Sequence, residues 1–131
     1  MEQNEKTKAL LAAFGCALAY LLAGKALTAV LPQVPEEAAR MWAFVHRCAA
    51  APIVEELVFR GIIQQLARPL GERQAVALQA VLFAVQHRGP AGMAYALVCG
   101  LVLGMLRSRT GSVWPGMLLH TLNNLLVFAA G

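Results

Sequence analysis

Three ionisable side chains stand close together in the segment PIVEELVFRG, residues 52–61, which is otherwise apolar. Glu56 and Arg60 are four positions apart with the acid first, the favourable order for an ion pair on one helix face. Glu55 is rotated by about 100° from Glu56 on a helix, so it shares the arginine less easily. The spacing predicts that Arg60 neutralises Glu56, while Glu55 remains a carboxylate in an apolar wall, which suits a general base.

A structural role is the alternative for this segment. Both glutamates would then pair with Arg60 and Arg47 and orient neighbouring helices, as ionisable networks in protein interiors also do. A charge at the centre of a membrane helix costs about 2.5–3.5 kcal/mol, so both interpretations require partners for these side chains. The segment alone leaves both open.

Two further segments place polar side chains in apolar surroundings. FAVQH puts Phe83 and His87 on one helix face, and HTLNN does the same for His120 and Asn124. Taken singly, these residues are most simply structural, as interfacial groups or hydrogen-bonding links between helices. Together with Glu55 they supply a carboxylate, two imidazoles and an amide from three helices. That set suffices for hydrolysis, because it offers a base for water, a group that orients it and donors for a tetrahedral oxyanion.

The elements that position these residues are predicted to be membrane helices. The chain has 131 residues and is 59% hydrophobic and 14% charged. Soluble domains are roughly 45–50% apolar. One domain of this length cannot hide so much apolar surface, so the excess is expected to face lipid. We predict an all-α fold, a polytopic transmembrane helical bundle.

Proline, glycine and charged residues divide the chain into about five membrane helices. An uncleaved first span and a polar loop precede four helices, with expected ranges of about 9–31 for the span, 32–40 for the loop, then 41–66, 74–87, 93–107 and 113 to the C-terminus. Several are shorter than the roughly 20 residues that cross a bilayer, so tilted or re-entrant geometry is expected. Residues 1–40 form the N-terminal helix and loop, and residues 41–131 form the core with the candidate site. Gly100 and Gly104, spaced as in GxxxG, predict close approach of the fourth helix to a neighbour.

Loop charges predict the orientation in the membrane. With the N-terminus in the cytoplasm, one side collects six basic residues and the other only two: Lys6, Lys8, Arg68, Arg73, Arg107 and Arg109, against Arg40 and Arg88. This asymmetry favours a cytoplasmic N-terminus. No basic run with interleaved aromatic residues occurs, so nucleic acid is not an expected partner. The three cysteines lie far apart in apolar runs and predict no disulfide framework.

The three motifs, in their order along the chain, resemble the signature of the CPBP family (CAAX proteases and bacteriocin-processing enzymes, also called the Abi family). That signature is EExxxR, then FxxxH, then HxxxN, and here it covers about residues 52–125. The resemblance implies an intramembrane endopeptidase whose substrate is a CAAX-type prenylated protein or a leader peptide. It also implies roles for the motif residues: Glu55 and His87 activate water, His120 and Asn124 stabilise the oxyanion, and Glu56, Arg60 and Phe83 support them.

Metal dependence is a point on which the resemblance and the residues differ. The family is often described as metalloprotease, and Glu55, His87 and His120 could hold zinc with a bound water. The chain has no HExxH motif, which would preorganise two ligands on one helix. We therefore expect a glutamate-type mechanism that requires no cofactor, with a zinc-dependent protease as the alternative.

Other functions compatible with the sequence are non-catalytic. A membrane immunity or scaffold protein of the same fold is the main alternative, and a small proton-coupled transporter is disfavoured because no inverted repeat is visible. The expected partners are the lipid bilayer and a membrane-associated peptide or protein substrate. Relatives usually have more membrane helices, so a partner or a homo-oligomer could complete the substrate path. A chain without a cleaved signal or disulfides suits a bacterial cytoplasmic membrane.

Overall fold

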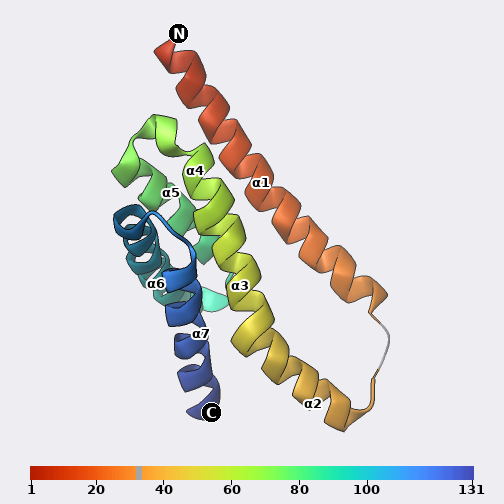
Figure 1. Ribbon diagram of the computed structural model, residues 1–131. Coiled ribbons are helices and arrows are strands. Elements are labelled where there is room, and N and C mark those ends of the chain that lie inside the picture. Colours follow the sequence, from red (N-terminus) through yellow and green to blue (C-terminus); the bar gives the residue numbers. More distant parts are fainter. Residues whose placement is uncertain (32–33) are drawn as a thin grey trace.

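The computed structural model describes residues 1–31 and 34–131, and these residues form five helical rods with no strand among them (Figure 1). The first rod is α1 (Glu2–Val30), and the second runs without interruption from α2 (Glu36–Val45) to α4 (Gln64–Leu66). A short 3₁₀ turn, η3 (Arg68–Leu70), leads into α5 (Glu72–Ala84). The last two rods are α6 (Gly89–Thr110) and α7 (Trp114–Ala129). The all-α prediction is confirmed for the described residues.

The second rod contains two π-helical segments. They are η1 (His46–Ala50), after α2, and η2 (Glu56–Ile63), after the short α3 (Ala51–Glu55). A π-helical turn holds more residues than an α-helical turn, so it rotates the following side chains and loosens the regular backbone ladder. The EELVFRG motif therefore begins where α3 gives way to η2. Its regular helical period was assumed from the sequence, and this local change of geometry was not predicted.

Several predicted boundaries were wrong. The loop expected over residues 32–40 is shorter, because α2 begins at Glu36 directly after Pro35. Acidic residues in a first helical turn are stabilised by the positive end of the helix dipole, which explains a start at Glu36. Pro32 and Gln33, also assigned to that loop, lie outside the described residues. α1 extends beyond the N-terminal end of the predicted span, because it begins at Glu2.

The helices predicted over 74–87 and 93–107 also differ from those observed. α5 ends at Ala84, so the last residues of the FAVQH motif lie in the following turn. α6 begins at Gly89, because Pro90 fits a first helical turn, where its missing N–H costs nothing. The sequence had instead suggested that RGPAG would be a connecting segment up to residue 93.

The long second rod lies between α1 on one side and α5, α6 and α7 on the other (Figure 1). α5 and α6 lie close together at Gly100, where an added Cβ would lie 2.9 Å from Cα of Ala80. One turn on, an added Cβ at Gly104 would clash with Nε2 of Gln79 and lie 3.1 Å from the Val76 side chain. The predicted close approach through this GxxxG pair is confirmed, and it fixes the helices around the candidate site.

Much of the outer surface is apolar. Large hydrophobic side chains such as Leu11 (69% exposed) on α1, Val98 (61%) on α6 and Leu126 (72%) on α7 point away from the bundle. α1 and α6 are each long and apolar enough to cross a bilayer. α5, with 13 residues, and α7, with 16, are shorter than the roughly 20 residues that a full crossing needs. The predicted number of five crossings therefore stays a prediction.

Candidate active site

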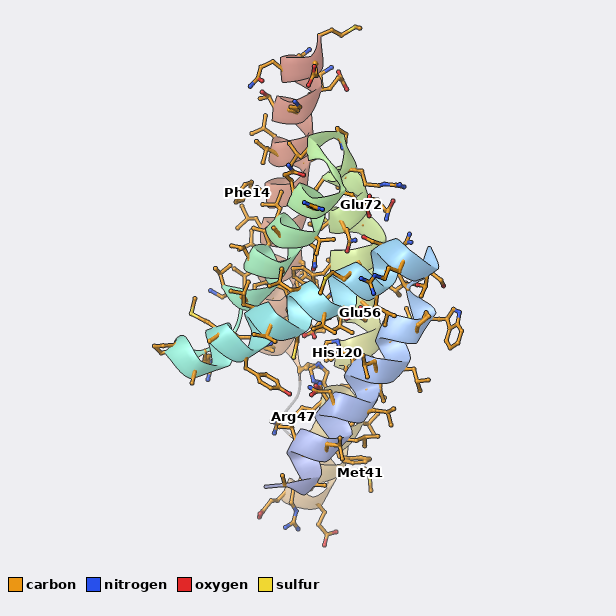
Figure 2. The ribbon with its side chains drawn as sticks, turned by 90° about the vertical axis from the view of Figure 1, so that its left-hand side faces the viewer. Phe14, Met41, Arg47, Glu56, Glu72 and His120 are labelled. Atoms are coloured by element: carbon orange, nitrogen blue, oxygen red, sulfur yellow. The ribbon has the colours of Figure 1, made fainter. Side chains whose placement is uncertain are left out.

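His120 of α7 contacts both glutamates of the EELVFRG motif. Its Nδ1 lies 2.8 Å from Oε1 of Glu56, and its Nε2 lies 3.5 Å from Oε2 of Glu55. Figure 2 shows Glu56 and His120 close together near the middle of the bundle. The imidazole is almost completely buried, with 7% of its side chain exposed. One histidine therefore joins α7 to the junction of α3 and η2.

The two glutamates have different surroundings. Glu56 has no exposed surface, and its Oε1 lies 3.0 Å from Nη1 of Arg60, which is equally buried. The Arg60 guanidinium also lies over the Phe83 ring, with Cζ 4.6 Å from the ring centroid. Glu55 keeps 20% of its side chain exposed and forms no ion pair with Arg60. The predicted Glu56–Arg60 pair is confirmed, and Glu55 is the glutamate that keeps exposed surface.

Arg47 does not take part in this network. Its guanidinium lies over the ring of Phe128, 5.7 Å from the centroid. The alternative in which Arg47 neutralises one of the glutamates is not seen in the described part of the chain. A structural network of Glu56, Arg60 and His120 remains, with Glu55 at its edge.

Gly116 allows α7 to approach this network. A Cβ added at this position would lie 2.8 Å from Oε2 of Glu56. Gly116 precedes His120 by four residues and therefore shares its helix face. The sequence analysis missed Gly116. The signal was present in WPGMLLH, where a glycine stands one turn before a motif histidine.

His87 is held against Phe83 in the turn after α5. Its Nδ1 lies 3.0 Å from the backbone oxygen of Phe83. A carbonyl oxygen only accepts, so Nδ1 carries the hydrogen of this bond, and Nε2 of the neutral ring is an acceptor. The two rings pack edge to face with centroids 4.7 Å apart. The predicted contact between these two residues is confirmed, although His87 itself is not helical.

Phe83 connects the two histidines. Its ring, 2% exposed, packs against His87 on one side and lies 5.9 Å from the His120 ring, centroid to centroid. A third aromatic contact, with Phe59 at 5.1 Å, fixes the ring in the core. Phe83 thus brings both imidazoles and the Arg60 guanidinium around one side chain. This is the physical reason for an aromatic residue one turn before His87.

Asn124 points to a different group. Its Nδ2 donates to the backbone oxygen of Arg47 in η1, at 2.8 Å. Its Oδ1 accepts from Nδ2 of Asn123 at 3.3 Å, and Oδ1 of Asn123 accepts from the hydroxyl of Tyr95 on α6. Among the described residues, the Asn124 side chain forms no hydrogen bond with His87 or His120. Tyr95 and Asn123 were not assigned to the site from the sequence, and only the NN doublet hinted at a linked pair of amides.

A small hollow opens beside His120 between α6 and α7. Its volume is about 200 Å³, and apolar side chains line most of it: Val98, Cys99, Val102, Leu103 and Leu119, with His120 and Asn123 as the polar members. The hollow is large enough for an apolar side chain and reaches the buried imidazole.

Metal ligation was tested on the same residues. No group of three His, Cys, Asp or Glu side chains within residues 1–31 and 34–131 is placed to hold a metal ion. His120 directs both ring nitrogens to carboxylates, and His87 directs Nδ1 to a backbone oxygen. In this arrangement the set of Glu55, His87 and His120 does not fit zinc, so no step below uses a metal. The expectation that no metal is required stays a prediction.

The fold and the site define a class: a helical bundle with two helices long and apolar enough to cross a membrane, and with two carboxylates and an imidazole in contact inside it. Residues 37–126 match the model of one family, described as Rce1-like, type II CAAX prenyl endopeptidase Rce1-like. The chain belongs to this family, and the resemblance drawn from the three motifs is confirmed. No curated protein and no solved structure matches the chain. Membership in a protease family makes the chain a peptidase and an integral membrane protein.

Proposed function

We propose that the chain is an intramembrane endopeptidase of glutamate type that cleaves a membrane-associated substrate. The observation that carries this proposal is the unequal glutamate pair on one histidine. Glu56 is closed off by Arg60 and His120, whereas Glu55 contacts the same imidazole and retains exposed surface. A structural network needs no such open carboxylate, whereas a hydrolase needs one within reach of water.

The two ring nitrogens of His120 give Glu55 and Glu56 different roles in the proposed reaction. Glu56 at Nδ1 favours a hydrogen on that nitrogen, because the carboxylate only accepts. The contact between Nε2 and Glu55 then requires a proton on one of these two groups, since two lone pairs would repel each other. In the proposed reaction His120 donates from Nε2, and Glu56 fixes the ring for this through its contact with Nδ1. In this role Glu56 orients His120 rather than touching the substrate.

The proposed hydrolysis uses these groups in turn. Glu55 accepts a proton from water, and Nε2 of His87 helps to orient that water. The water oxygen attacks the scissile carbonyl carbon, and the resulting oxyanion accepts a hydrogen bond from Nε2 of His120. Breakdown of the tetrahedral intermediate breaks the C–N bond, and the proton held by Glu55 passes to the leaving amine.

Asn124 is the second oxyanion donor in this proposal. Its amide NH₂ has two hydrogens, and one of them is used on the Arg47 carbonyl. The other has no partner among the described residues and is available to an oxyanion. The bond to Arg47 therefore fixes the amide rather than consuming it.

The proposed substrate is a CAAX-type prenylated protein, with a leader peptide as the alternative. The family description names a prenyl endopeptidase, which favours the first. The apolar hollow beside His120 supports a substrate with an apolar side chain next to the scissile bond. Orientation with the N-terminus in the cytoplasm, in a bacterial cytoplasmic membrane, remains part of the proposal.

Glu55→Gln tests the proposal, because glutamine has the same shape but cannot accept the proton. In proteoliposomes with a farnesylated CAAX peptide, we expect activity to fall by about 10²–10⁴-fold, the usual contribution of a general base. Glu37→Gln, at an exposed position in the first turn of α2, is the matched control and should retain wild-type activity. Full activity of Glu55→Gln would instead support the immunity or scaffold interpretation.

Chelation tests the metal-free mechanism separately. We expect the wild-type protein to keep its activity after exhaustive treatment with a chelator, because none of the proposed proton transfers uses a metal. The assay is the same peptide cleavage, before and after removal of divalent ions. Loss of activity with recovery on adding zinc or cobalt would establish the zinc-dependent alternative.

A further inference from the structure

A second hollow, of about 430 Å³, lies between the start of α5 and the end of α6. It is lined by two arginines, a glutamate, a serine and two apolar residues: Glu72, Arg73, Val76, Met105, Ser108 and Arg109. Figure 2 shows Glu72 well apart from Glu56 and His120, towards one end of the bundle. The hollow is therefore separate from the candidate active site, and the proposed function does not use it.

The charges around this hollow are unequally compensated. Glu72 is satisfied, because its Oε2 lies 3.5 Å from Nε of Arg68 and its Oε1 accepts from the hydroxyl of Ser108. Ser108 in turn accepts from Nε2 of Gln64 at 3.0 Å, which holds the hydroxyl in place. Arg73 and Arg109 have no carboxylate partner among the described residues. Two cationic groups therefore line a hollow whose only acid is already paired.

Arg107 adds to the positive charge nearby. It precedes Ser108, and its Nε is buried without a hydrogen-bond partner in the described part of the chain. Four arginines and one glutamate stand in residues 68–73 and 107–109, so this end of the helix pair has a clear excess of positive charge. The hollow beneath is apolar, with Val76 and Met105 along its wall. A cationic rim over an apolar wall matches a molecule that has an anionic head and an apolar chain.

We infer that this hollow binds an anionic phospholipid, with its phosphate at Arg73 and Arg109 and an acyl chain along Val76 and Met105. Arginine binds phosphate oxygens through paired N–H donors. In a membrane, the open side of the pair formed by α5 and α6 would face lipid. Basic pockets between membrane helices near the cytoplasmic surface are suited to anionic head groups. The inference does not depend on peptidase activity, since none of the proposed catalytic residues lines the hollow.

Lipid binding is measured by native mass spectrometry of the purified protein, titrated with phosphatidylglycerol or phosphatidylcholine. The double variant Arg73→Gln/Arg109→Gln should bind phosphatidylglycerol roughly thirtyfold more weakly than wild type, at about 1 kcal/mol for each arginine. Its affinity for phosphatidylcholine should not change. Arg40→Gln/Arg88→Gln removes the same charge from exposed positions elsewhere and should bind phosphatidylglycerol like wild type.

Three results would overturn the inference. Equal affinity of wild type and Arg73→Gln/Arg109→Gln for phosphatidylglycerol would show that the arginines do not bind the head group. An equal loss in Arg40→Gln/Arg88→Gln would show a diffuse surface attraction. Displacement of phosphatidylglycerol by glycerol phosphate at equal concentration would show a site for free anions, because that compound lacks the acyl chain.

Discussion

Glu55 and Glu56 are adjacent in the sequence but differ in exposure, because Glu56 faces the interior of the bundle and Glu55 lies at the edge of that interior. Glu56 faces Arg60 and His120 with no exposed surface, whereas Glu55 lies about 100° around the helix and keeps 20% of its side chain exposed. The ion pair was predictable from the sequence, because the helical period alone brings positions four apart together. The contact of both glutamates with His120 was not predictable from spacing, because it depends on where α7 packs. The family resemblance placed Glu55 and His120 in one site, but it implied no contact between Glu56 and His120.

Glu56→Gln tests the buried ion pair. Removing one partner leaves the Arg60 charge buried without compensation, which costs about 3–5 kcal/mol. We expect the free energy of unfolding in detergent to fall by about that amount, because neither side chain has exposed surface. Glu37→Gln, at an exposed position, should change stability by less than about 0.5 kcal/mol.

The double variant Glu56→Gln/Arg60→Met completes this test. Removing both charges should recover much of the lost stability, since an apolar replacement of similar volume avoids the unpaired charge. The single variant Arg60→Met completes the set. If the stability loss of Glu56→Gln/Arg60→Met equals the sum of the losses of Glu56→Gln and Arg60→Met, then Glu56 and Arg60 are not coupled.

Gly116→Ala tests how close α7 must come to Glu56. The added methyl group would lie 2.8 Å from Oε2 of Glu56, so either that carboxylate or α7 has to move. We expect a lower kcat, because displacement of Glu56 from Nδ1 removes the group that orients His120. Gly24→Ala in α1 is the control, since nothing lies within 4 Å of its added Cβ. A Gly116→Ala protein with wild-type kcat would contradict the positioning role of Glu56.

The elements were predicted in number and order, but not in detail. The apolar composition and the positions of proline, glycine and charged residues indicated the helices. They gave no sign of the π-helical segments η1 and η2. Such segments depend on tertiary contacts, such as the amide of Asn124 on the Arg47 carbonyl, and not on local propensity. The early end of α5 has a local cause, because the His87 side chain bonds to the backbone oxygen of Phe83, four residues earlier. The displacement of His87 from its helix left its contact with Phe83 intact.

Gly100→Ala tests the packing of α5 against α6. The added Cβ would meet the backbone of Ala80 at 2.9 Å, and backbone cannot turn aside as a flexible side chain can. We expect the two helices to separate and the melting temperature in detergent to fall by several degrees, consistent with an overpacking cost of about 1–3 kcal/mol. Gly15→Ala in α1 makes no such contact and should melt like wild type or slightly higher. An unchanged melting temperature for Gly100→Ala would mean that this contact does not hold the helices together.

At the scale of the whole molecule, α1 packs against the core that supports the site, because Ala13 and Ala17 belong to the same cluster as Phe59 and Phe83. Small residues form its buried stripe, Ala9, Ala13 and Ala17, and Tyr20 meets Phe59 with ring centroids 5.5 Å apart. The remaining faces of α1 expose large apolar side chains, which suits lipid. α1 therefore covers one side of the long rod without contributing a catalytic group. The family match also begins after it, at residue 37.

Orientation is the prediction that belongs to the whole molecule. The N-terminus and the connection between α4 and α5 lie towards one end of the bundle, whereas the start of α2 and the C-terminus lie towards the other (Figure 1). The first end carries Lys6, Lys8, Arg68 and Arg73. Because basic residues near membrane helices stay in the cytoplasm, we expect this end to be cytoplasmic.

Single cysteines in a cysteine-free protein, labelled in sealed right-side-out vesicles, measure this orientation. A membrane-impermeant maleimide should label Glu37→Cys from outside, whereas Gln3→Cys and Gln74→Cys should react only after the vesicles are opened. Labelling of Gln3 and Glu37 from the same side would mean that α1 does not cross the membrane. Gln74 reacting from outside together with Glu37 would mean that the long rod does not cross. If Gln3→Cys and Gln74→Cys were labelled from outside and Glu37→Cys only after opening, the orientation would be the reverse of the predicted one. The arginine-lined hollow would then lie at the outer leaflet, and the charge asymmetry would not set the topology.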